Sequence, residues 1–325
     1  MICITILNWN GFQDTIECLD SLNKMNYSDY FVVVGDNGST NESMIEIERF
    51  CNKQSIKIDV VENINYTVIN LQERQVVLLD LKENNGFSKG NNLMIEFSEK
   101  YNPDYYFLLN NDTVIDPSCI SILNSFITQN KAYKVVIPRI NYFYNNKVVW
   151  NCGGKLFWGF RKYYYAKKNE SVIKKDIMDV SFVTGCALLV SSDLVHNHKL
   201  LTEIFFFGEE DFEFSIRMKK QKVKMVCVTS AIVYHKVSAS KSNISNINTT
   251  HLHYLNRFVN MKNHMGKLEY KIWKFIYFPY IFQLLYRQGF SVKTSWKLLN
   301  TINTESSTLY EVPKCLFHQI LNITN

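Results

Sequence analysis

Several polar residues stand at positions that suit chemistry on phosphorylated substrates, and Asp112 is the first of them. It follows the apolar run Tyr105–Leu109, with Asn110 two residues before it. Oxygen ligands just past a buried strand can hold a hard cation such as Mg²⁺ or Mn²⁺. Such a cation bridges a diphosphate and stabilises the negative charge that develops on a nucleotide leaving group. A helix N-cap ahead of Asp116 and Pro117 explains Asp112 equally well.

A second group is the acidic segment 209–213, which is expected to open a helix. Acidic residues in a first helical turn commonly complement the helix dipole, worth under about 1 kcal/mol. Glu213 and Arg217 also form an ordinary i,i+4 pair. The aromatic segment 205–208 before them can instead desolvate a carboxylate and raise its pKa, as a general base for a hydroxyl requires. Taken alone, the segment favours the structural interpretation.

His235 is the third candidate, at the end of a strand expected over 223–234. A histidine in that place is more often structural than a ligand. The next segment, 238–250, is rich in Ser, Asn and Thr without apolar periodicity, and it is expected to be a flexible loop. A loop beside His235 would suit an active-site lid.

The elements that must position these residues form a repeated pattern of strand, polar turn and helix. Apolar runs over 2–7, 31–35, 76–81 and 105–109 each end in polar residues, and Asp14 is expected to cap the first helix. This order predicts a parallel α/β sheet, in which ligands bind beyond the carboxyl ends of the strands. The polar turns at that edge hold Asn8, Asp36, Asn85 and Asp112.

Seven short segments, in a fixed order, cover residues 1 to about 260. They are 4–11 (ITILNWNG), 34–40 (VGDNGST), 85–92 (NGFSKGNN), 108–113 (LLNNDT), 184–189 (TGCALL), 207–211 (FGEED) and 233–235 (VYH). Together they resemble glycosyltransferase family 2 with the GT-A fold, most closely its rhamnosyltransferase-like branch. The resemblance implies a Rossmann-like, mostly parallel sheet flanked by helices. It also implies inverting transfer of a hexosyl or deoxyhexosyl group from a nucleoside-diphosphate sugar.

The resemblance further implies a role for each matching position. Asp211, next to Glu210, would be the base that deprotonates the acceptor hydroxyl. Asp112 would bind Mn²⁺ or Mg²⁺, and His235 would be a second metal or diphosphate contact. Asn8 and Asp36 would hold the base and ribose of the donor, and the turn 85–92 would line its pocket. The residues implied to bind the donor are Asn8, Asn10, Asp36, Asn85, Gly86, Lys89, Asn92, Asn110 and Asn111.

The sequence departs from the family pattern in three places. Asn110 replaces the first aspartate of the D-x-D motif, which weakens the metal assignment slightly. Residues 62–75 are interpreted as an insertion before the third core strand. Glu213 stands where this branch usually has aspartate.

Two other functions were weighed. The first is a catalytically silent scaffold that binds nucleotide or glycan, and the presence of Asp112, Asp211 and His235 argues against it. The second is a nucleotidyltransferase, which would normally need a glycine-rich and basic first turn for a triphosphate. The first turn here, 8–11, is Asn-Trp-Asn-Gly.

Charge and cysteine content bear on the setting of the protein. The eight cysteines are scattered without a C-x-x-C pair, and no signal peptide is recognised after Met1. We therefore expect reduced thiols in a cytoplasmic protein. Residues 1–256 are balanced in charge, whereas 257–325 carry nine basic residues against three acidic ones. Because no nucleic-acid-binding module accompanies them, a nucleic-acid partner is not expected.

The chain is expected to divide into a catalytic domain over 1–250 and a helical extension over 251–325. The nucleotide half of the domain would cover about 1–115, and the acceptor half about 116–250. In the extension, aromatic and aliphatic residues between 271 and 293 are framed by cations, which suits peripheral contact with the cytoplasmic face of a membrane and a lipid-linked glycan acceptor. The alternative is that these aromatics pack on the catalytic domain or a second subunit.

Overall fold

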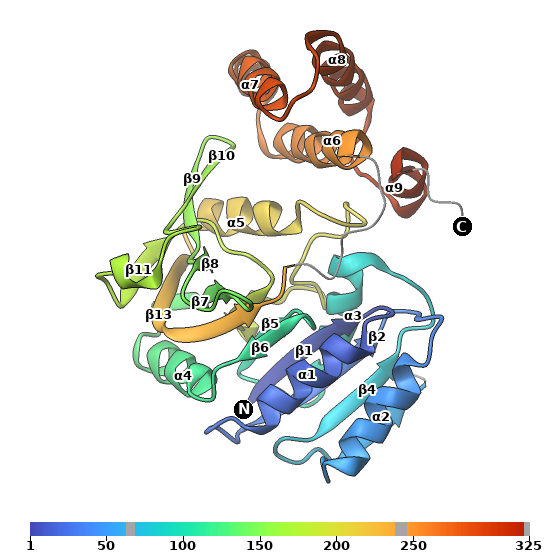
Figure 1. The fold of residues 1–325 in the computed structure, drawn as a ribbon, viewed down its shortest axis with the longest axis vertical. Helices are drawn as coiled ribbons and strands as arrows, with labels where there is room; N and C mark the ends of the chain where they lie inside the picture. The colour runs from blue at the N-terminus through green and yellow to red at the C-terminus, as the bar shows by residue number, and fades with distance from the viewer. Residues whose placement is uncertain (63–68, 238–245, 322–325) are drawn as a thin grey trace.

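The central element of the fold is a large twisted sheet, seen in a computed structural model that describes residues 1–62, 69–237 and 246–321 (Figure 1). Its amino-terminal half is parallel, as the sequence predicts, with strand order β5-β1-β2-β4-β3. Continuous apolar runs suit these strands because both faces of the sheet are covered. The strands are β1 (Ile2–Asn8), β2 (Tyr30–Asp36), β3 (Ile58–Val61), β4 (Val76–Asp80) and β5 (Tyr105–Leu109).

Helices cover the two faces of this half and divide its core in two. The first cluster packs α1, α2 and α4 against one face, and the second packs α3 and α5 against the other. Asp14 lies in the first turn of α1 and Gly11 is the N-cap, so the expected cap at Asp14 is wrong. The helices are α1 (Phe12–Asn23), α2 (Ser43–Lys53), α3 (Gly86–Glu99), α4 (Cys119–Gln129) and α5 (Glu210–Lys220).

The other half of the sheet is mixed. There β12 runs antiparallel between β5 and β7, and β13 lies parallel to β7. Two short strands, β9 and β10, form a separate hairpin. The strands are β6 (Thr113–Ile115), β7 (Tyr133–Tyr142), β8 (Val149–Asn151), β9 (Gly154–Phe157), β10 (Phe160–Tyr163), β11 (Ile177–Val180), β12 (Ala187–Ser191) and β13 (Lys224–His235), with 3₁₀ turns over Glu170–Val172 and Ser192–Leu194.

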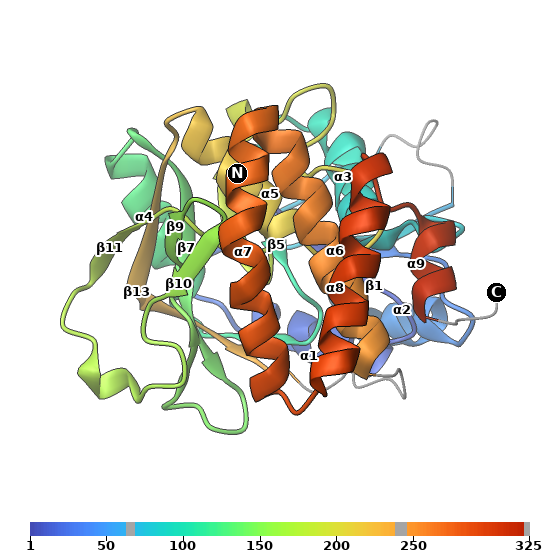
Figure 2. The ribbon, with the colours of Figure 1, turned by 90° about the horizontal axis from the view of Figure 1, so that it is seen from above.

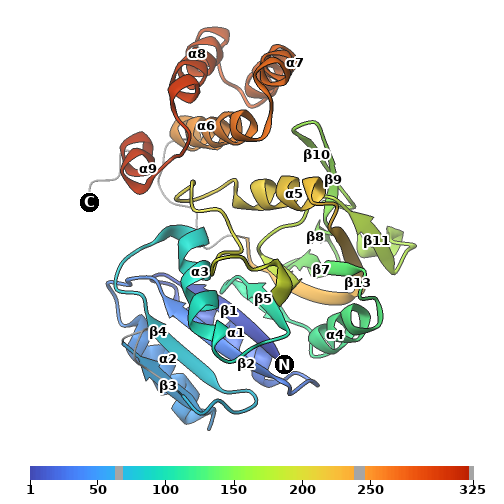
Figure 3. The ribbon, with the colours of Figure 1, turned by 180° about the vertical axis from the view of Figure 1, so that it is seen from behind.

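A layer of helices lies over α5, on the far side from the sheet (Figures 1 and 3). It consists of α6 (Asn246–His264), α7 (Lys267–Arg287), α8 (Val292–Thr308) and α9 (Lys314–Leu321). Because α6 begins at Asn246, the flexible loop expected over 238–250 is wrong for its last five positions, and the expected domain boundary at 250 falls inside a helix. Residues 238–245 of that loop, and 63–68 of the expected insertion, lie outside the described residues.

The long helix α7 has one buried and one exposed apolar face. Trp273, Tyr277, Ile281 and Leu285 recur every four residues and join a core cluster with Leu156 and residues of α5, α6 and α8. On the opposite face Phe275 is 83% exposed. The buried aromatic residues of α7 therefore pack on the rest of the protein. For the buried face of α7, this agrees with the alternative that these aromatics pack within the protein. Helix α7 continues through Pro279, and none of the helices described is long and apolar enough to cross a membrane.

The cysteines are free thiols, as the sequence predicts. Seven of them are buried in the cores and Cys315 is exposed. Burial raises the pKa of Cys3 and of Cys18 to about 12, so these two side chains act as small apolar groups.

The packing of α7 predicts opposite outcomes for two aromatic residues on the same helix. Trp273→Ala should lower the free energy of unfolding by about 3–5 kcal/mol, because it empties a fully buried position. Phe275→Ala, on the exposed face, should change it by less than about 0.5 kcal/mol. Urea unfolding followed by circular dichroism measures both. Equal effects would mean that α7 does not pack through its Trp273 face.

Candidate active site

Strand pairing brings together two candidates that are more than a hundred residues apart in sequence. Strand β6 pairs antiparallel with β13 so that Thr113 lies opposite His235. Asp112, one residue before Thr113, therefore meets the imidazole, and its Oδ2 lies 3.1 Å from Nε2 of His235. Both side chains are largely buried. The N-cap interpretation of Asp112 is wrong, because a strand follows it and Ser118 is the N-cap of α4.

The spacing of Asp112 and His235 fits a divalent cation. Two adjacent ligands of an octahedral ion, each about 2.1 Å from it, are separated by about 3 Å. An edge-on contact from Trp150, with ring centroids 4.5 Å apart, fixes the imidazole plane. No group of three or more His, Cys, Asp or Glu side chains suited to a metal occurs in the part of the chain that the structure covers.

Asn8 and Asp36 lie side by side because β1 and β2 are parallel and in register at their carboxyl ends. Asn8 Nδ2 donates to Asp36 Oδ1 at 2.7 Å, and Asn8 Oδ1 accepts from Thr15 at 2.8 Å. The backbone N–H of Ser39 donates to the other oxygen of Asp36 at 2.9 Å. Asn8 has no exposed surface, so its amide orients the Asp36 carboxylate at the rim of the sheet.

The other asparagines near the β1 turn link neighbouring loops. Asn10 adopts a positive φ of 54° and accepts from the backbone N–H of Thr40 at 2.8 Å, which ties the first two polar turns together. Asn111 Nδ2 donates to the Thr15 hydroxyl at 3.1 Å. The backbone N–H of Asn110 donates to the carbonyl of Cys186 at 2.9 Å. These contacts place all three residues around the same rim as Asp36.

The segment 85–92 is mostly helix rather than a turn, since α3 begins at Gly86. Gly86 has a positive φ of 76°, and a Cβ there would come 2.1 Å from the carbonyl oxygen of Phe206. Asn85, at the N-cap, donates its backbone N–H to the side chain of Asn37 at 2.9 Å.

Two residues of this segment differ from the others in their surroundings. Asn92 is buried, and its amide makes four hydrogen bonds with the segment 200–203. It therefore holds that segment in place rather than lining an open pocket, which corrects the role implied for it. Lys89 is exposed on the first turn of α3.

Glu210 and Asp211 open α5 in a confined place. Asp211 Oδ1 accepts the backbone N–H of Gly185 at 2.7 Å, and a Cβ on Gly185 would come 2.9 Å from the same oxygen. Burial raises the pKa of Asp211, although the bond from Gly185 opposes that rise. Burial and the Asp211 charge raise the pKa of Glu210 to about 8. Because the two carboxyl groups are neighbours, a negative charge on Asp211 disfavours a second negative charge on Glu210.

One short segment connects the two groups of candidates. Cys186 accepts the N–H of Asn110, two residues before Asp112, while Gly185 donates to Asp211. The sequence marked 184–189 as a motif but gave its residues no role. Farther along α5, Glu213 and Arg217 form the ion pair that their spacing predicts, at 3.1 Å.

Sequence reasoning missed Arg161, which comes from the hairpin. Its guanidinium lies 5.2 Å from the ring centre of Phe182 and 5.9 Å from that of Phe212, and its charge lowers the pKa of Asp211. A lone arginine between aromatic residues in a short strand carries no spacing signal. Only the folded hairpin brings it to α5.

The mostly parallel sheet, flanked by helices and with these residues at its carboxyl edge, is a fold of the GT-A type. The family model described as Glycosyltransferase like family 2 matches residues 2–251, and the chain belongs to that family. Its glycosyltransferase assignment is thereby confirmed at the level of the family. Among curated protein sequences, none matches the chain.

Solved structures with the same fold are distant in sequence. GalNAc-T7 with UDP, GalNAc and Mn²⁺ is 12% identical with a TM-score of 0.62, over 99% of this chain and 54% of that one. The present chain thus spans about half the length of GalNAc-T7. The Pyrobaculum calidifontis mannosyltransferase PcManGT, with GDP-Man and Mn²⁺, is 9% identical with a TM-score of 0.57, over 99% and 83%. S. aureus TarS with UDP is 13% identical with a TM-score of 0.52, over 83% and 68%.

Proposed function

We propose that this protein transfers a sugar from a nucleoside-diphosphate sugar to a hydroxyl of a glycan or glycolipid, with inversion at the anomeric carbon. The observation that carries the proposal is the joining of Asp112–His235 and Glu210–Asp211 through Gly185 and Cys186 at one edge of the sheet. The first pair suits a leaving diphosphate, and the second suits an attacking hydroxyl. The order of the seven segments supports a place in the rhamnosyltransferase-like branch.

In the proposed mechanism, Asp112 and His235 would hold Mn²⁺ or Mg²⁺, and a bound cation would supply positive charge for the diphosphate of the donor. The structures of PcManGT with GDP-Man and Mn²⁺ and of GalNAc-T7 with UDP and Mn²⁺ support this choice of ligand. Asp36, oriented by Asn8, binds the nucleoside with its free acceptor capacity. The proposed donor pocket is bordered by the residues Asn10, Asn85, Gly86, Asn110 and Asn111.

Asp211 is the proposed general base. It is confined at the start of α5, it accepts the backbone N–H of Gly185, and burial raises its pKa, which suits a base for an acceptor hydroxyl. Removing that proton as the oxygen attacks, on the face opposite the leaving group, gives inversion. Glu210, protonated at neutral pH, keeps a second negative charge away from Asp211. The rival function is a catalytically silent scaffold, in which Glu210 and Asp211 would have no catalytic role.

Replacing the proposed base tests the mechanism. Asp211→Asn should lower turnover by about 100-fold or more, because the amide cannot take the proton, with donor affinity little changed. In the wild-type enzyme turnover should fall as pH drops through the raised pKa of Asp211, hence at a pH above that of an ordinary aspartate. Steady-state kinetics across pH measure both. Glu210→Gln is the matched control, and an equal loss from it would contradict the assignment of Asp211.

Donor and metal binding can be tested without any acceptor. The melting temperature should rise with one nucleotide among UDP, GDP, dTDP and CMP, and only when Mn²⁺ or Mg²⁺ is present, since a ligand of the folded state stabilises it. Asp112→Asn should remove the metal-dependent part of the rise. A thermal-shift screen of the purified protein measures this. A well-folded sample that responds to none of these nucleotides would favour the scaffold.

We further propose that the protein works at the cytoplasmic face of a membrane. Helices α7 and α8 lie side by side on the surface remote from the sheet (Figures 1 and 2). Their outer face, here called the α7–α8 face, exposes Leu268, Ile272, Phe275, Tyr286, Val292 and Trp296. Exposed cations lie among them: Lys267, Lys271, Arg287, Lys293 and Lys297.

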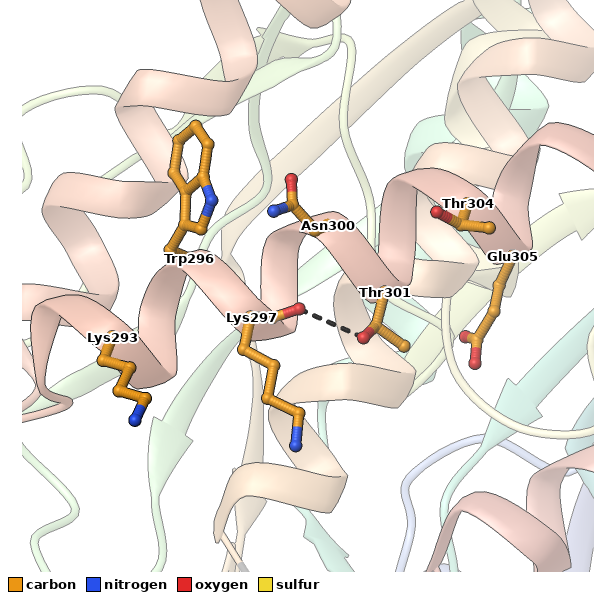
Figure 4. A pocket seen from close by; sticks show the side chains of 7 residues that line it. All are labelled: Lys293, Trp296, Lys297, Asn300, Thr301, Thr304 and Glu305. Carbon is orange, nitrogen blue, oxygen red and sulfur yellow. Dashed lines mark hydrogen bonds between the residues drawn. The ribbon is translucent and has the colours of Figure 1, made fainter.

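The composition of the α7–α8 face suits an anionic lipid surface. None of its five cations takes part in an ion pair among the residues that the structure describes. On α8, the aromatic side chain of Trp296 and the cationic side chains of Lys293 and Lys297 line the same pocket (Figure 4). Aromatic rings enter the headgroup region while lysines meet lipid phosphate or carboxylate. A membrane-bound acceptor would then be held near the protein.

Binding to vesicles tests the α7–α8 face. The protein should sediment with vesicles of phosphatidylcholine and phosphatidylserine, and less with phosphatidylcholine alone or at high salt. Phe275→Ser should reduce binding several-fold, by removing an exposed aromatic residue. Tyr144→Ser is the matched control, because Tyr144 is 79% exposed on a distant turn. Equal binding by both variants, or none by the wild type, would contradict membrane contact.

A further inference from the structure

The residue that precedes the Glu210–Asp211 pair has an unusual backbone. Glu209 is the N-cap of α5 and adopts a left-handed conformation with φ of 75°. A left-handed backbone is unfavourable for a residue with a side chain and persists only where its surroundings enforce it. The conformation turns the chain sharply between the aromatic segment 205–208 and α5. Something outside α5 must therefore hold Glu209.

That hold comes from α6. The guanidinium of Arg257 pairs with the carboxylate of Glu209, and both side chains are almost fully buried, at 3% and 2% exposure. Asn260, one turn later, donates to the same carboxylate at 2.9 Å. Asn256 donates to the carbonyl of Phe207 at 3.0 Å. Three side chains of one helix thus hold the backbone that leads into α5.

Arg257 is itself held by three other elements. It donates to the carbonyl of Gly159 in the hairpin turn at 3.3 Å and to the Tyr277 hydroxyl of α7 at 3.4 Å. Its guanidinium lies 3.4 Å from the ring centre of Phe212. A planar, permanently charged group can make all these contacts at once, whereas an ammonium group cannot. The helical layer, the hairpin and α5 therefore meet at this one side chain.

We propose that Arg257 is a positioning residue for the transfer reaction, which sets the geometry and the electrostatic balance of the Glu210–Asp211 pair through Glu209. The proposal rests on the proposed role of Asp211 as the base. It assigns the helical layer a part in catalysis that is separate from any contact with a membrane.

The electrostatic part follows from the charges around Asp211. Glu209 raises the pKa of both Asp211 and Glu210, and in the native protein its charge is balanced by Arg257. Without Arg257, the Glu209 carboxylate is unpaired beside Glu210 and Asp211. Without the charge of Glu209, the Arg257 guanidinium is the unpaired group. The ionisable groups that face Asp211 are Glu209 and Glu210 from its own turn, Arg161 and Tyr163 from β10, and Cys186 from the segment before β12.

Turnover should fall on the low-pH side of its pH profile, here called the acid limb. Two single substitutions should move this acid limb in opposite directions. Arg257→Met should shift it to higher pH by about half a unit or more, and Glu209→Gln to lower pH. Arg257→Met should also lower kcat by roughly 10- to 100-fold, with KM for the donor little changed, because the base is misplaced. The double variant should return the limb toward its wild-type position while kcat stays low. Arg257→Lys keeps the charge and should leave the limb in place.

The matched control is Arg217→Met, which removes the other arginine–carboxylate pair of α5, at Glu213. It should leave the acid limb unchanged. Shifts of the limb in the same direction for Arg257→Met and Glu209→Gln, or an unchanged limb in both, would overturn the proposal. If Arg257→Met folds poorly by circular dichroism, Glu209→Gln alone still tests the electrostatic role, because an acid limb that stays at its wild-type pH in that variant would overturn the proposal.

A readout that needs no turnover separates this proposal from the proposed function. Hydrogen exchange of the peptide covering 205–215, measured by mass spectrometry, should speed up in Arg257→Met and not in Arg217→Met, because only the first loses the contact that holds Glu209. Unchanged exchange in Arg257→Met would overturn the positioning role. An Asp211→Asn enzyme with full turnover would instead overturn the base, and leave the exchange result as it stands.

Discussion

The register of backbone hydrogen bonds at the carboxyl edge of the sheet is the constraint on which the rest of the site depends. Pairing of β6 with β13 sets His235 opposite Thr113, and pairing of β12 with β5 brings Cys186 to Asn110. A shift of one residue in either ladder would turn these side chains to the opposite face. The distance between Asp112 and His235 is thus a property of strand pairing more than of the side chains themselves.

Around this edge the protein places buried polar groups that hydrogen-bond to one another. Asn8 and Asp36 bond each other, Asp211 accepts from a backbone N–H, and Glu209 meets Arg257. Polar groups that are buried and paired are rigid, because breaking any one contact leaves an unsatisfied partner. The helical layer contributes to this rigidity through Arg257. It is therefore joined to the site by charge as well as by apolar packing.

Much of the fold could be predicted from periodicity and turn residues. The runs that became β1, β2, β4 and β5 are apolar throughout, and each ends in a polar turn. Such patterns depend on a few neighbouring residues, so they can be recognised without knowledge of the rest of the structure. Local reasoning failed at Asp14 and at residues 246–250, where packing of the whole helix determined where it begins. A polar composition suggested a loop at 246–250, but contact with other helices outweighs that weak preference.

The sequence by itself determined the order of elements, the motifs and the family, because these depend on residue identity along the chain. Only the tertiary structure decided which motifs meet. It showed that Asn92 supports a neighbouring segment, that Arg161 reaches α5, and that Arg257 is buried against Glu209. Such contacts join residues far apart in sequence, and no local spacing encodes them. They arise when separate elements bury their apolar faces together and the polar groups between them must find partners.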